Sequence, residues 1–390
     1  MERDRRLSES RARWAVAAIF LANGFVVGSW AAQIPLVKER LSIGHDELGL
    51  ALFAMAAGAL CAMALGGAAI ARFGSAAVVS ASALVCFAAF PLAIFAPALA
   101  LLLPAAFVFG AANGLLDVAM NAHGVMVESR IGRPFMSSFH GMWSLGGLLG
   151  AGFSGLLLSI VAASAAALFA SGLALAGAVP ALLNLLPAGA DSDRGGPGFV
   201  LPDRATFALG ALCFLAMTTE GAVLDWSALH LKDRLGLGAG VAATGFAAFA
   251  ATMAAGRFVG DWLRARVAAV PLVRASAFLA AAGLAVALAA PMPALAVAGF
   301  AVVGLGMSNL VPIFISASAR IPGHAPGTAI AAVATMGYVG FLAGPPVIGA
   351  VAEVTSLTLA LALIVLACLL IGVSAAAVAP RRRAAFGARS

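Results

Sequence analysis

Charge and cysteine are both scarce in this 390-residue chain. Only 10% of its residues are charged, whereas 63% are hydrophobic and the mean hydropathy is +1.06. A soluble globular domain of this length would expose far too much apolar surface, so this class is excluded. The four cysteines form no CxxC pair and all fall in apolar stretches. They indicate small buried hydrophobic residues and argue against a redox or zinc centre.

Two further absences narrow the function. No Gly-x-x-x-x-Gly-Lys loop occurs, so ATP is not expected to drive the protein. The pI near 10.2 and the formal net charge of +7 would fit nucleic-acid binding. The arginines, however, lie at the edges of apolar stretches, where they anchor a membrane protein beside anionic lipid. No nucleic-acid partner is therefore expected.

What the sequence does contain is a series of apolar stretches of membrane-spanning length. Twelve can be marked, each of roughly 20 residues, as a transmembrane helix requires. Their limits are 14–35, 48–71, 76–96, 98–122, 135–160, 163–186, 205–229, 241–263, 270–290, 293–318, 325–350 and 356–379. The first stretch is too long for a signal-peptide core and should remain in place. The predicted fold class is an all-α polytopic membrane protein with twelve transmembrane helices.

The distribution of Lys and Arg predicts how the chain crosses the membrane. Of 23 such residues, four are assigned to odd-numbered gaps between spans: Lys38, Arg40, Lys232 and Arg234. The remaining nineteen are assigned to even-numbered gaps and to the tails, so both termini are predicted to be cytoplasmic. This assignment leaves no Lys or Arg in the middle of a span. Transporters of anions usually need a fixed cation there, so we expect a neutral or cationic solute.

The chain also has the pattern of a duplication. Residues 188–204, rich in Gly, Pro and mixed charge, are predicted to be a cytoplasmic linker. A shift of 194 residues superposes span 5 on span 11, with Gly146 on Gly340, and a shift of 190 places Gly66 of span 2 on Gly256 of span 8. We therefore predict two pseudo-symmetric six-helix bundles, residues 1–187 and 205–390, with the solute site between them.

This organisation resembles the major facilitator superfamily. That family has Gly-x-x-x-Asp-Arg-x-Gly after span 2, a loop that latches the cytoplasmic side of the two halves. Here residues 67–74 read GAAIARFG, with Ala71 where the acid belongs, while 256–266 read GRFVGDWLRAR and keep the acid as Asp261. The resemblance implies that Arg72, Asp261 and Arg264 act in gating. Because the first copy lacks the acid, the strength of the contact that its loop makes is in doubt.

Within that superfamily, residues 113–151 resemble the fucose-permease branch of sugar–proton symporters. They are closer still to a bacterial group that includes rhizopine (inosamine) transport proteins, which shares the string EGAVLDWSALHL at 220–231. The resemblance implies a proton-coupled secondary transporter of the bacterial inner membrane. Such a protein moves a sugar, polyol or amino-sugar-like solute by alternating access. Its expected partners are this solute, protons and the bilayer, and it is expected to be a monomer without cofactor or metal.

Polar side chains within spans are functional candidates, because they are unfavourable in a bilayer unless they are paired or hydrated. Asn113, Asp117 and Asn121 recur every four residues, which places them on one face of span 4. We interpret Asp117 as a proton-coupling carboxylate, in the place of the glutamate of the fucose-permease branch. A buried packing role is the alternative. Glu220, near the middle of span 7, is the second candidate for proton coupling.

The remaining candidates fall into two groups. The predicted solute contacts are Asn23, Asn113, Asn121, Asn309 and Tyr338. The predicted gating residues, besides the three of the loop, are Asp225, His140 and Trp143. His123 and Glu128 are expected on the cytoplasmic side, as gating or snorkelling groups. For each of them, a hydrogen bond between helices or an interfacial position is the alternative.

Two other functions are open at this point. A multidrug efflux pump would also use glycine-rich spans, although span 5 lacks the proline of the usual efflux motif. A membrane-embedded hydrolase is the more remote alternative, since residues 152–155 read GFSG, like the nucleophile motif of intramembrane serine proteases. No later span has a histidine near its middle to act as the base, so no enzymatic activity is predicted.

Overall fold

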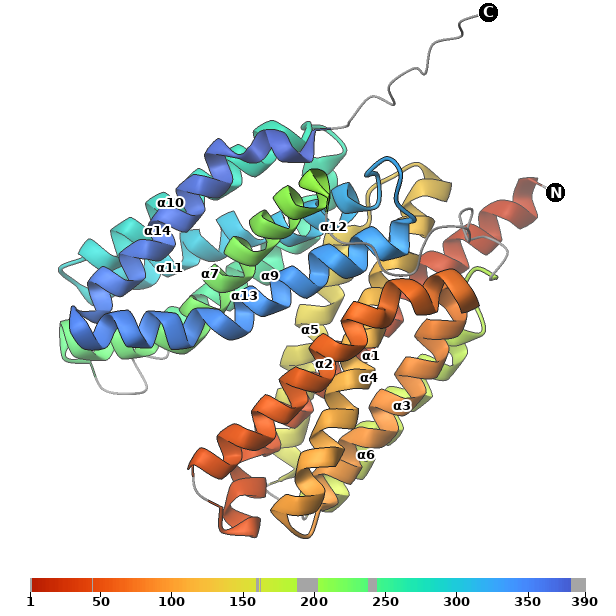
Figure 1. The fold of residues 1–390 in the computed structure, drawn as a ribbon, viewed down its shortest axis with the longest axis horizontal. Helices are drawn as coiled ribbons and strands as arrows, with labels where there is room; N and C mark the ends of the chain where they lie inside the picture. Colours follow the sequence, from red (N-terminus) through yellow and green to blue (C-terminus); the bar gives the residue numbers. More distant parts are fainter. Residues whose placement is uncertain are drawn as a thin grey trace, which may run out of the picture.

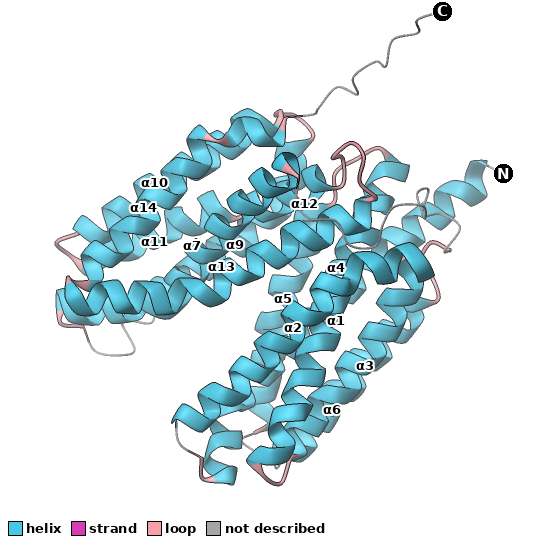
Figure 2. Ribbon diagram, viewed as in Figure 1, coloured by secondary structure: helices cyan, strands magenta, loops and turns pink. Residues whose placement is uncertain are grey.

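The computed structural model describes residues 2–43, 45–158, 161, 163–187, 203–237 and 244–379. Within these ranges every regular element is a helix, so the all-α prediction is confirmed (Figure 2). The helices are α1 (Glu2–Leu41), α2 (His45–Phe73), α3 (Ser75–Phe95), α4 (Leu99–Ile131), α5 (Met136–Leu157), α6 (Ala163–Leu182), α7 (Arg204–Leu235), α9 (Thr244–Arg264), α10 (Ala269–Ala289), α11 (Pro293–Met307), α12 (Leu310–Ser318), α13 (Pro326–Val354), α14 (Leu357–Val373) and the 3-10 helix η2 (Ala375–Val378).

Each predicted span corresponds to one helical segment, with α11 and α12 together forming the tenth. In the described part of the chain, nine segments are long and apolar enough to cross a membrane, and α11–α12 counts as one of them. Helices α5, α9 and α14 complete the twelve without meeting these criteria, α14 being a shorter apolar helix. The predicted linker, residues 188–204, lies almost entirely outside the described residues.

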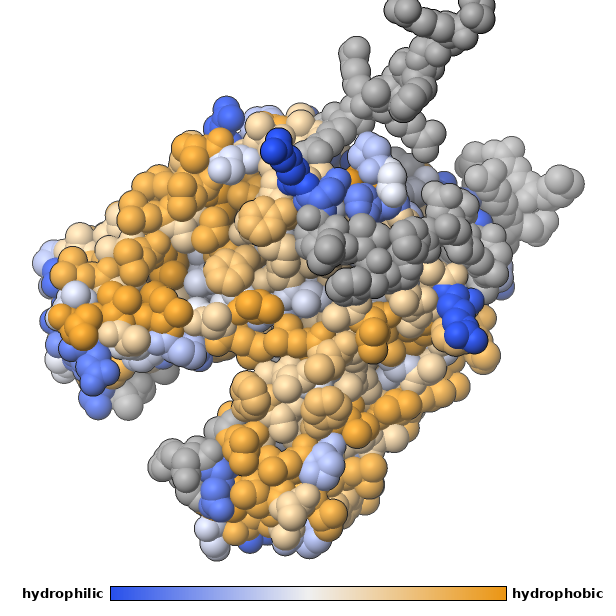
Figure 3. Space-filling view, viewed as in Figure 1, coloured by the Kyte–Doolittle hydropathy of each residue, from blue (hydrophilic) through white to orange (hydrophobic). Residues whose placement is uncertain are grey.

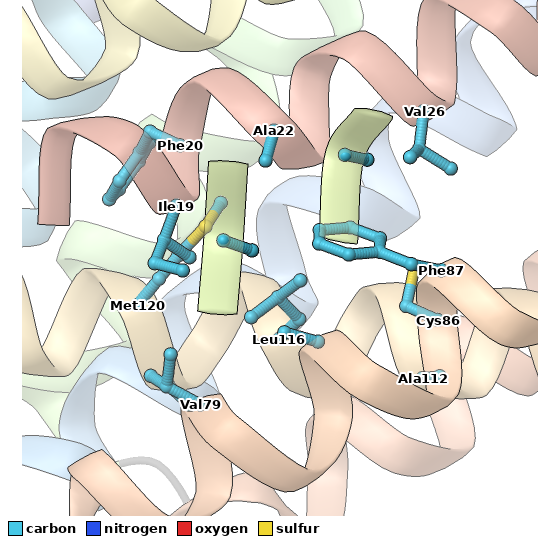
Figure 4. Packing of buried hydrophobic residues seen from close by; sticks show 14 of the residues in the cluster. Ile19, Phe20, Ala22, Val26, Val79, Cys86, Phe87, Ala112, Leu116 and Met120 are labelled. Atoms are coloured by element: carbon cyan, nitrogen blue, oxygen red, sulfur yellow. The ribbon is translucent and has the colours of Figure 1, made fainter. Parts of the chain in front are cut away.

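The helices form two bundles, α1–α6 and α7–α14 (Figure 1). Each has its own core of buried apolar side chains. In the first core Phe20 of α1, Phe87 of α3 and Leu116 of α4 are fully buried within one cluster (Figure 4). In a bilayer, lipid is as apolar as these side chains, so they stabilise the bundle mainly by close van der Waals packing. The first core also includes buried residues of the second bundle, Ile315 of α12 and Ile330, Ala331 and Ala334 of α13, so the two bundles are in apolar contact.

The packing of the first bundle repeats in the second. Helix α1 packs on α5 as α7 packs on α13, and α2 packs on α4 as α9 packs on α11. Gly146 of α5 lies against the backbone carbonyl of Leu21, and its predicted repeat mate, Gly340 of α13, lies against the carbonyl of Phe214. A Cβ atom at either glycine would collide with that backbone, so close approach of the helices requires glycine at both.

The bundles meet at one end and diverge at the other. Helix α5 packs on α9, and α2 packs on α13. The end where α4 and α9 finish and α5 and α13 begin is called the closed end here. The start of α1 also lies there, because the Arg13 guanidinium sits 4.2 Å from the ring centre of Phe135. At the opposite end a wedge-shaped opening separates the bundles, whose outer surfaces are largely apolar (Figure 3).

Candidate functional site

Three helices of the first bundle are joined through one buried amide. Asn23 of α1 donates from Nδ2 to Oδ1 of Asn113 on α4, at 2.8 Å. Its own Oδ1 accepts from Nε1 of Trp143 on α5, also at 2.8 Å. Asn23 is only 1% exposed. The sequence-predicted residues Asn23, Asn113 and Trp143 therefore form one hydrogen-bonded group, which fixes the direction of the Asn23 amide.

A second group contains Asp117, Asn121 and His140. Nδ2 of Asn121 donates to the backbone oxygen of Asp117 at 2.9 Å and to its Oδ1 at 3.3 Å. Oδ1 of Asn121 lies 3.0 Å from Nε2 of His140. Because an amide oxygen can only accept, this orientation of Asn121 places the proton of the imidazole on Nε2. Asp117 is half-buried and, among the described residues, has no ion pair.

The second bundle contributes a buried ion pair. Nη2 of Arg257 on α9 lies 3.7 Å from Oε2 of Glu220 on α7, and Nη1 donates to Oγ of Ser144 on α5 at 2.5 Å. Ser144 in turn donates to the backbone oxygen of His140 at 3.1 Å. The Arg257 side chain is 5% exposed and that of Glu220 is 21% exposed. Arg257 thus connects the acid of one bundle to the polar residues of the other.

Arg257 overturns an expectation from the sequence. It lies thirteen residues after Thr244 and seven before Arg264, well inside α9, so the prediction that no Lys or Arg lies in the middle of a span is wrong. Its position within the predicted span 241–263 was the signal that could have revealed it. Since α9 contains a buried guanidinium, the absence of a fixed cation no longer disfavours an anionic solute. Because Glu220 compensates the guanidinium, the pair carries no net charge, and it offers both donors and an acceptor.

Tyr338 lies where the two bundles face each other. It belongs to α13 of the second bundle, yet it packs against the apolar core of the first. The preceding residue, Gly337, lies against the thiol of Cys213 on α7, and α13 also packs against α4. The helices that carry Asp117, Glu220 and Tyr338 therefore meet between the bundles.

The closed end is held by a separate polar network, which we call the latch: Glu128, Ser137, Ser138, Asp261, Arg264 and Ser316. Asp261 of α9 accepts from the backbone amides of Ser137 at 3.0 Å and Ser138 at 2.9 Å, and from the Ser138 hydroxyl. An acid of one bundle thereby caps the first turn of α5 in the other. This is a favourable place for negative charge.

Arg264 and Glu128 complete the latch. Nη1 of Arg264 lies 3.2 Å from Oε1 of Glu128 and 3.6 Å from Oδ1 of Asp261, and Nη2 donates to Oγ of Ser316 at 2.7 Å. Glu128 also accepts from the backbone amides of Phe135 at 2.7 Å and Met136 at 2.8 Å. Two predicted gating residues, Asp261 and Arg264, thus meet at the contact between bundles. The serines had no distinguishing signal in the sequence.

Other predicted residues lie elsewhere. Asn309 occupies the break between α11 and α12, where it is buried and donates to the Gly256 carbonyl at 3.2 Å and to Oγ of Ser308 at 2.9 Å. Asp225 is exposed on α7, away from the latch. Arg72 is exposed at the end of α2, where it stacks on the Phe73 ring at 5.2 Å. These three residues belong neither to the polar groups around Asn23, Asp117 and Arg257 nor to the latch.

His123 and Ser154 have local surroundings of their own. The His123 ring is within hydrogen-bonding distance of Ser75 Oγ, at 2.8 Å, and accepts from the Leu186 amide at 3.1 Å. It therefore ties α4 to the start of α3 and the end of α6. Ser154 is buried and its hydroxyl has no hydrogen-bond partner among the described residues, so none of them acts on it as a base. The described residues also include no cluster of three or more metal-binding side chains.

This chain is similar to known proteins in both sequence and fold. The family model described as Major Facilitator Superfamily matches its residues 15–345. An uncharacterized MFS-type transporter of Yersinia pestis is 35% identical over 362 residues, covering 93% of this chain and 94% of the relative. Membrane protein MosC of Rhizobium meliloti is 36% identical over 353 residues, covering 90% and 86%.

Among solved structures, the fucose:proton symporter FucP of E. coli matches with a TM-score of 0.79 at 16% identity, covering 93% of this chain and 97% of FucP. A structure of FucP in the outward conformation gives a TM-score of 0.80 at 17% identity, covering 94% and 98%. At these identities the likeness shows the fold alone.

Proposed function

The chain belongs to the major facilitator superfamily, and on that premise we propose that it couples protons to the movement of a small hydroxylated solute across the bacterial inner membrane. The coarser statement, that it is a multi-pass membrane transporter and not an enzyme, follows from the family. The observation that carries the proposal is the position of Asp117. It is a half-buried carboxyl on α4, a membrane-spanning helix that packs against α13 of the other bundle, and among the described residues it has no ion pair.

The proposal assigns the closed end to the cytoplasm. The positive-inside rule supports this orientation, because Arg-rich segments flank the helix ends that meet there. The wedge-shaped opening then faces the periplasm, as in an outward-facing transporter (Figure 3). The bundles α1–α6 and α7–α14 move as units, and each transport cycle must break the latch.

Asp117 and Glu220 have different roles in this proposal. Removing the charge of Glu220 would leave the Arg257 guanidinium buried without a counter-ion, which is strongly unfavourable. Asp117 has an amide partner and, within the described part of the chain, no ion pair, so its charge can be removed by a proton without exposing another charge. We therefore assign proton transfer to Asp117 and treat Glu220 as the partner of Arg257.

The solute contacts are the amides and the phenol between the bundles, together with the Arg257–Glu220 pair. Asn113 and Tyr338 are half-buried, so part of each residue remains accessible to a solute. A hydroxyl group both donates and accepts, so it can bind the carboxylate and the guanidinium of the pair at once without adding charge. Burial of an extra charge would need compensation. This favours sugars, polyols or amino sugars, and a lipophilic drug would leave these groups unpaired.

Proteoliposomes that contain a pH-sensitive dye test the proposal. With the native chain, addition of a transported polyol should acidify the lumen as protons enter with the solute. Asp117→Asn should abolish acidification. Counterflow of labelled solute should persist, because the residues proposed to bind the solute are unchanged. Asp225→Asn removes an exposed carboxyl of the second bundle and serves as the control. Continued acidification by Asp117→Asn would overturn the assignment. Transport of lipophilic cations but of no polyol would favour the efflux alternative.

A further inference from the structure

A cavity of about 490 Å³ lies at the closed end, apart from Asp117, Glu220 and Tyr338. The first bundle contributes the end of α4 and the turn before α5. The second contributes the starts of α7 and α10, the end of α12 and η2. Glu128, Arg264 and Ser316 of the latch line it, but the proposed transport function assigns it no ligand.

Positive charge dominates the wall of this cavity. Arg133, Arg264 and Arg320 line it, and Glu128 is the one acid among its lining residues. Asp261, which is not a lining residue, also pairs with Arg264, so three positive and two negative charges leave a balance of +1. Both oxygens of Glu128 are already engaged. Oε1 accepts from two backbone amides, and Oε2 accepts from the Ser316 hydroxyl at 3.1 Å. The carboxylate therefore compensates the arginines only in part.

Two features of the wall can donate to an anion. The Arg264 side chain is 9% exposed, and its Nη1, although ion-paired with two acids, makes no hydrogen bond among the described residues. The first turn of α10 also lines the cavity, at Val267–Val270. Its N-cap residue, Ala268, supplies no side-chain cap, and this turn contains no acid. A helix N-terminus without a side-chain cap, beside arginines, attracts an anion, although Pro271 contributes no N–H to this turn.

The shape of the donor set distinguishes between anions. A carboxylate presents two oxygens in one plane, whereas a phosphate group presents oxygens in tetrahedral directions to arginines on several sides. Here the three arginines come from the α4–α5 turn, α9 and the end of α12, and the α10 amides come from a fourth element. We propose that this cavity binds a phosphate group.

The group has two possible sources, a membrane phospholipid headgroup and a soluble phosphate. Apart from Ser129 and Ser316, the rest of the wall is apolar, including Leu209, Ile313 and Ile321, and suits a phosphate attached to an apolar body. Nearby, Trp262 is 55% exposed and Arg266 stacks on it at 4.3 Å, as at a membrane–water interface. Both sources share the chemistry that the arginines recognise, so the experiment separates them.

The test uses the purified full-length chain and two probes. Thermal stability is measured in detergent with inorganic phosphate against chloride at equal ionic strength, and in nanodiscs of phosphatidylglycerol against phosphatidylcholine. The native chain should be stabilised by at least one of the two probes. The double variant Arg133→Gln/Arg320→Gln should bind the effective probe roughly tenfold more weakly. Both arginines are exposed, so the fold should be retained.

Two further variants keep the test decisive. Ala269→Asp places an acid in the first turn of α10, where it favours the helix but repels a phosphate, so it should abolish the response without loss of stability. Arg72→Gln removes an exposed arginine outside the cavity and should respond like the native chain. A response to lipid alone or to phosphate alone identifies the source. No response to either probe, or an equal loss in Arg72→Gln, would overturn the proposal.

Discussion

The two contacts between the bundles occupy equivalent places in the repeated structure but have different chemistry. Where α5 meets α9, the Asp261 carboxylate accepts hydrogen bonds from the start of α5, and Arg264 pairs with Glu128. Where α2 meets α13, small residues are in contact instead, with Gly67 against Thr328 and Gly327 against the side chain of Ile70. One contact is therefore held by charge and hydrogen bonds, and the other by close packing.

The difference follows from one position of the duplication. At the shift of 190 residues that pairs Gly66 with Gly256, Ala71 is the mate of Asp261. The α2–α13 contact therefore has Ala71 where the α5–α9 contact has Asp261, so it contains no acid at the equivalent position. We interpret the asymmetry as a way to keep the closed end specific but separable. A second buried charge network would have to be broken in every transport cycle.

The largest effect is expected from Asp261→Ala. It removes the acceptor of two backbone amides in α5, and each buried donor left unsatisfied costs about 1–3 kcal/mol. Hydrogen–deuterium exchange of the peptide that contains Ser137 and Ser138 should accelerate roughly 10- to 100-fold. Exchange at the start of α13 should change far less, because the packed contact does not depend on this acid. Equal acceleration at both contacts would show that they are not independent.

A smaller effect is expected from Gly67→Ala in the packed contact. Its Cβ would lie 2.7 Å from Cα of Thr328, so α2 and α13 must move apart at a cost of about 1–3 kcal/mol. The matched change in the latched contact is Gly141→Ala, whose Cβ would meet only the Phe258 ring, at 3.1–3.2 Å. That ring can turn aside, so the loss should stay below about 1 kcal/mol. Thermal unfolding in detergent should rank the two variants in this order, and the reverse order would contradict the comparison.

The smallest effect is expected from Ala71→Asp, which restores the acid to the first copy. Ala71 lies one turn after Gly67 on α2, so the new carboxylate would face the start of α13. Interaction with that helix N-terminus should stabilise the closed end by about 0.5–1 kcal/mol, slowing exchange in residues 327–331 and slowing transport. Ala71→Asn, with similar shape but no charge, separates the electrostatic part. Faster exchange in the Asp variant would mean that the position tolerates only a small apolar residue.

Several features of the site were available from the sequence because they depend on local spacing. The recurrence of Asn113, Asp117 and Asn121 every four residues predicted a common helical face. The structure places all three in hydrogen-bonded groups. The motif likewise showed that the first copy has Ala71 where the second copy has Asp261. Asn309 looked like the amides of span 4 but serves a helix break, since sequence alone does not show where a helix is interrupted.

Composition and charge distribution determined the all-α membrane class, the duplication and the family resemblance, because a bilayer imposes helix length, hydropathy and charge bias directly on the sequence. Only the tertiary structure decided which polar groups are partners. Arg257 reaches Glu220 and Ser144 from a third helix, and Asp261 caps a helix of the other bundle across more than 120 residues of sequence. Such contacts depend on how the bundles dock, which no local pattern encodes.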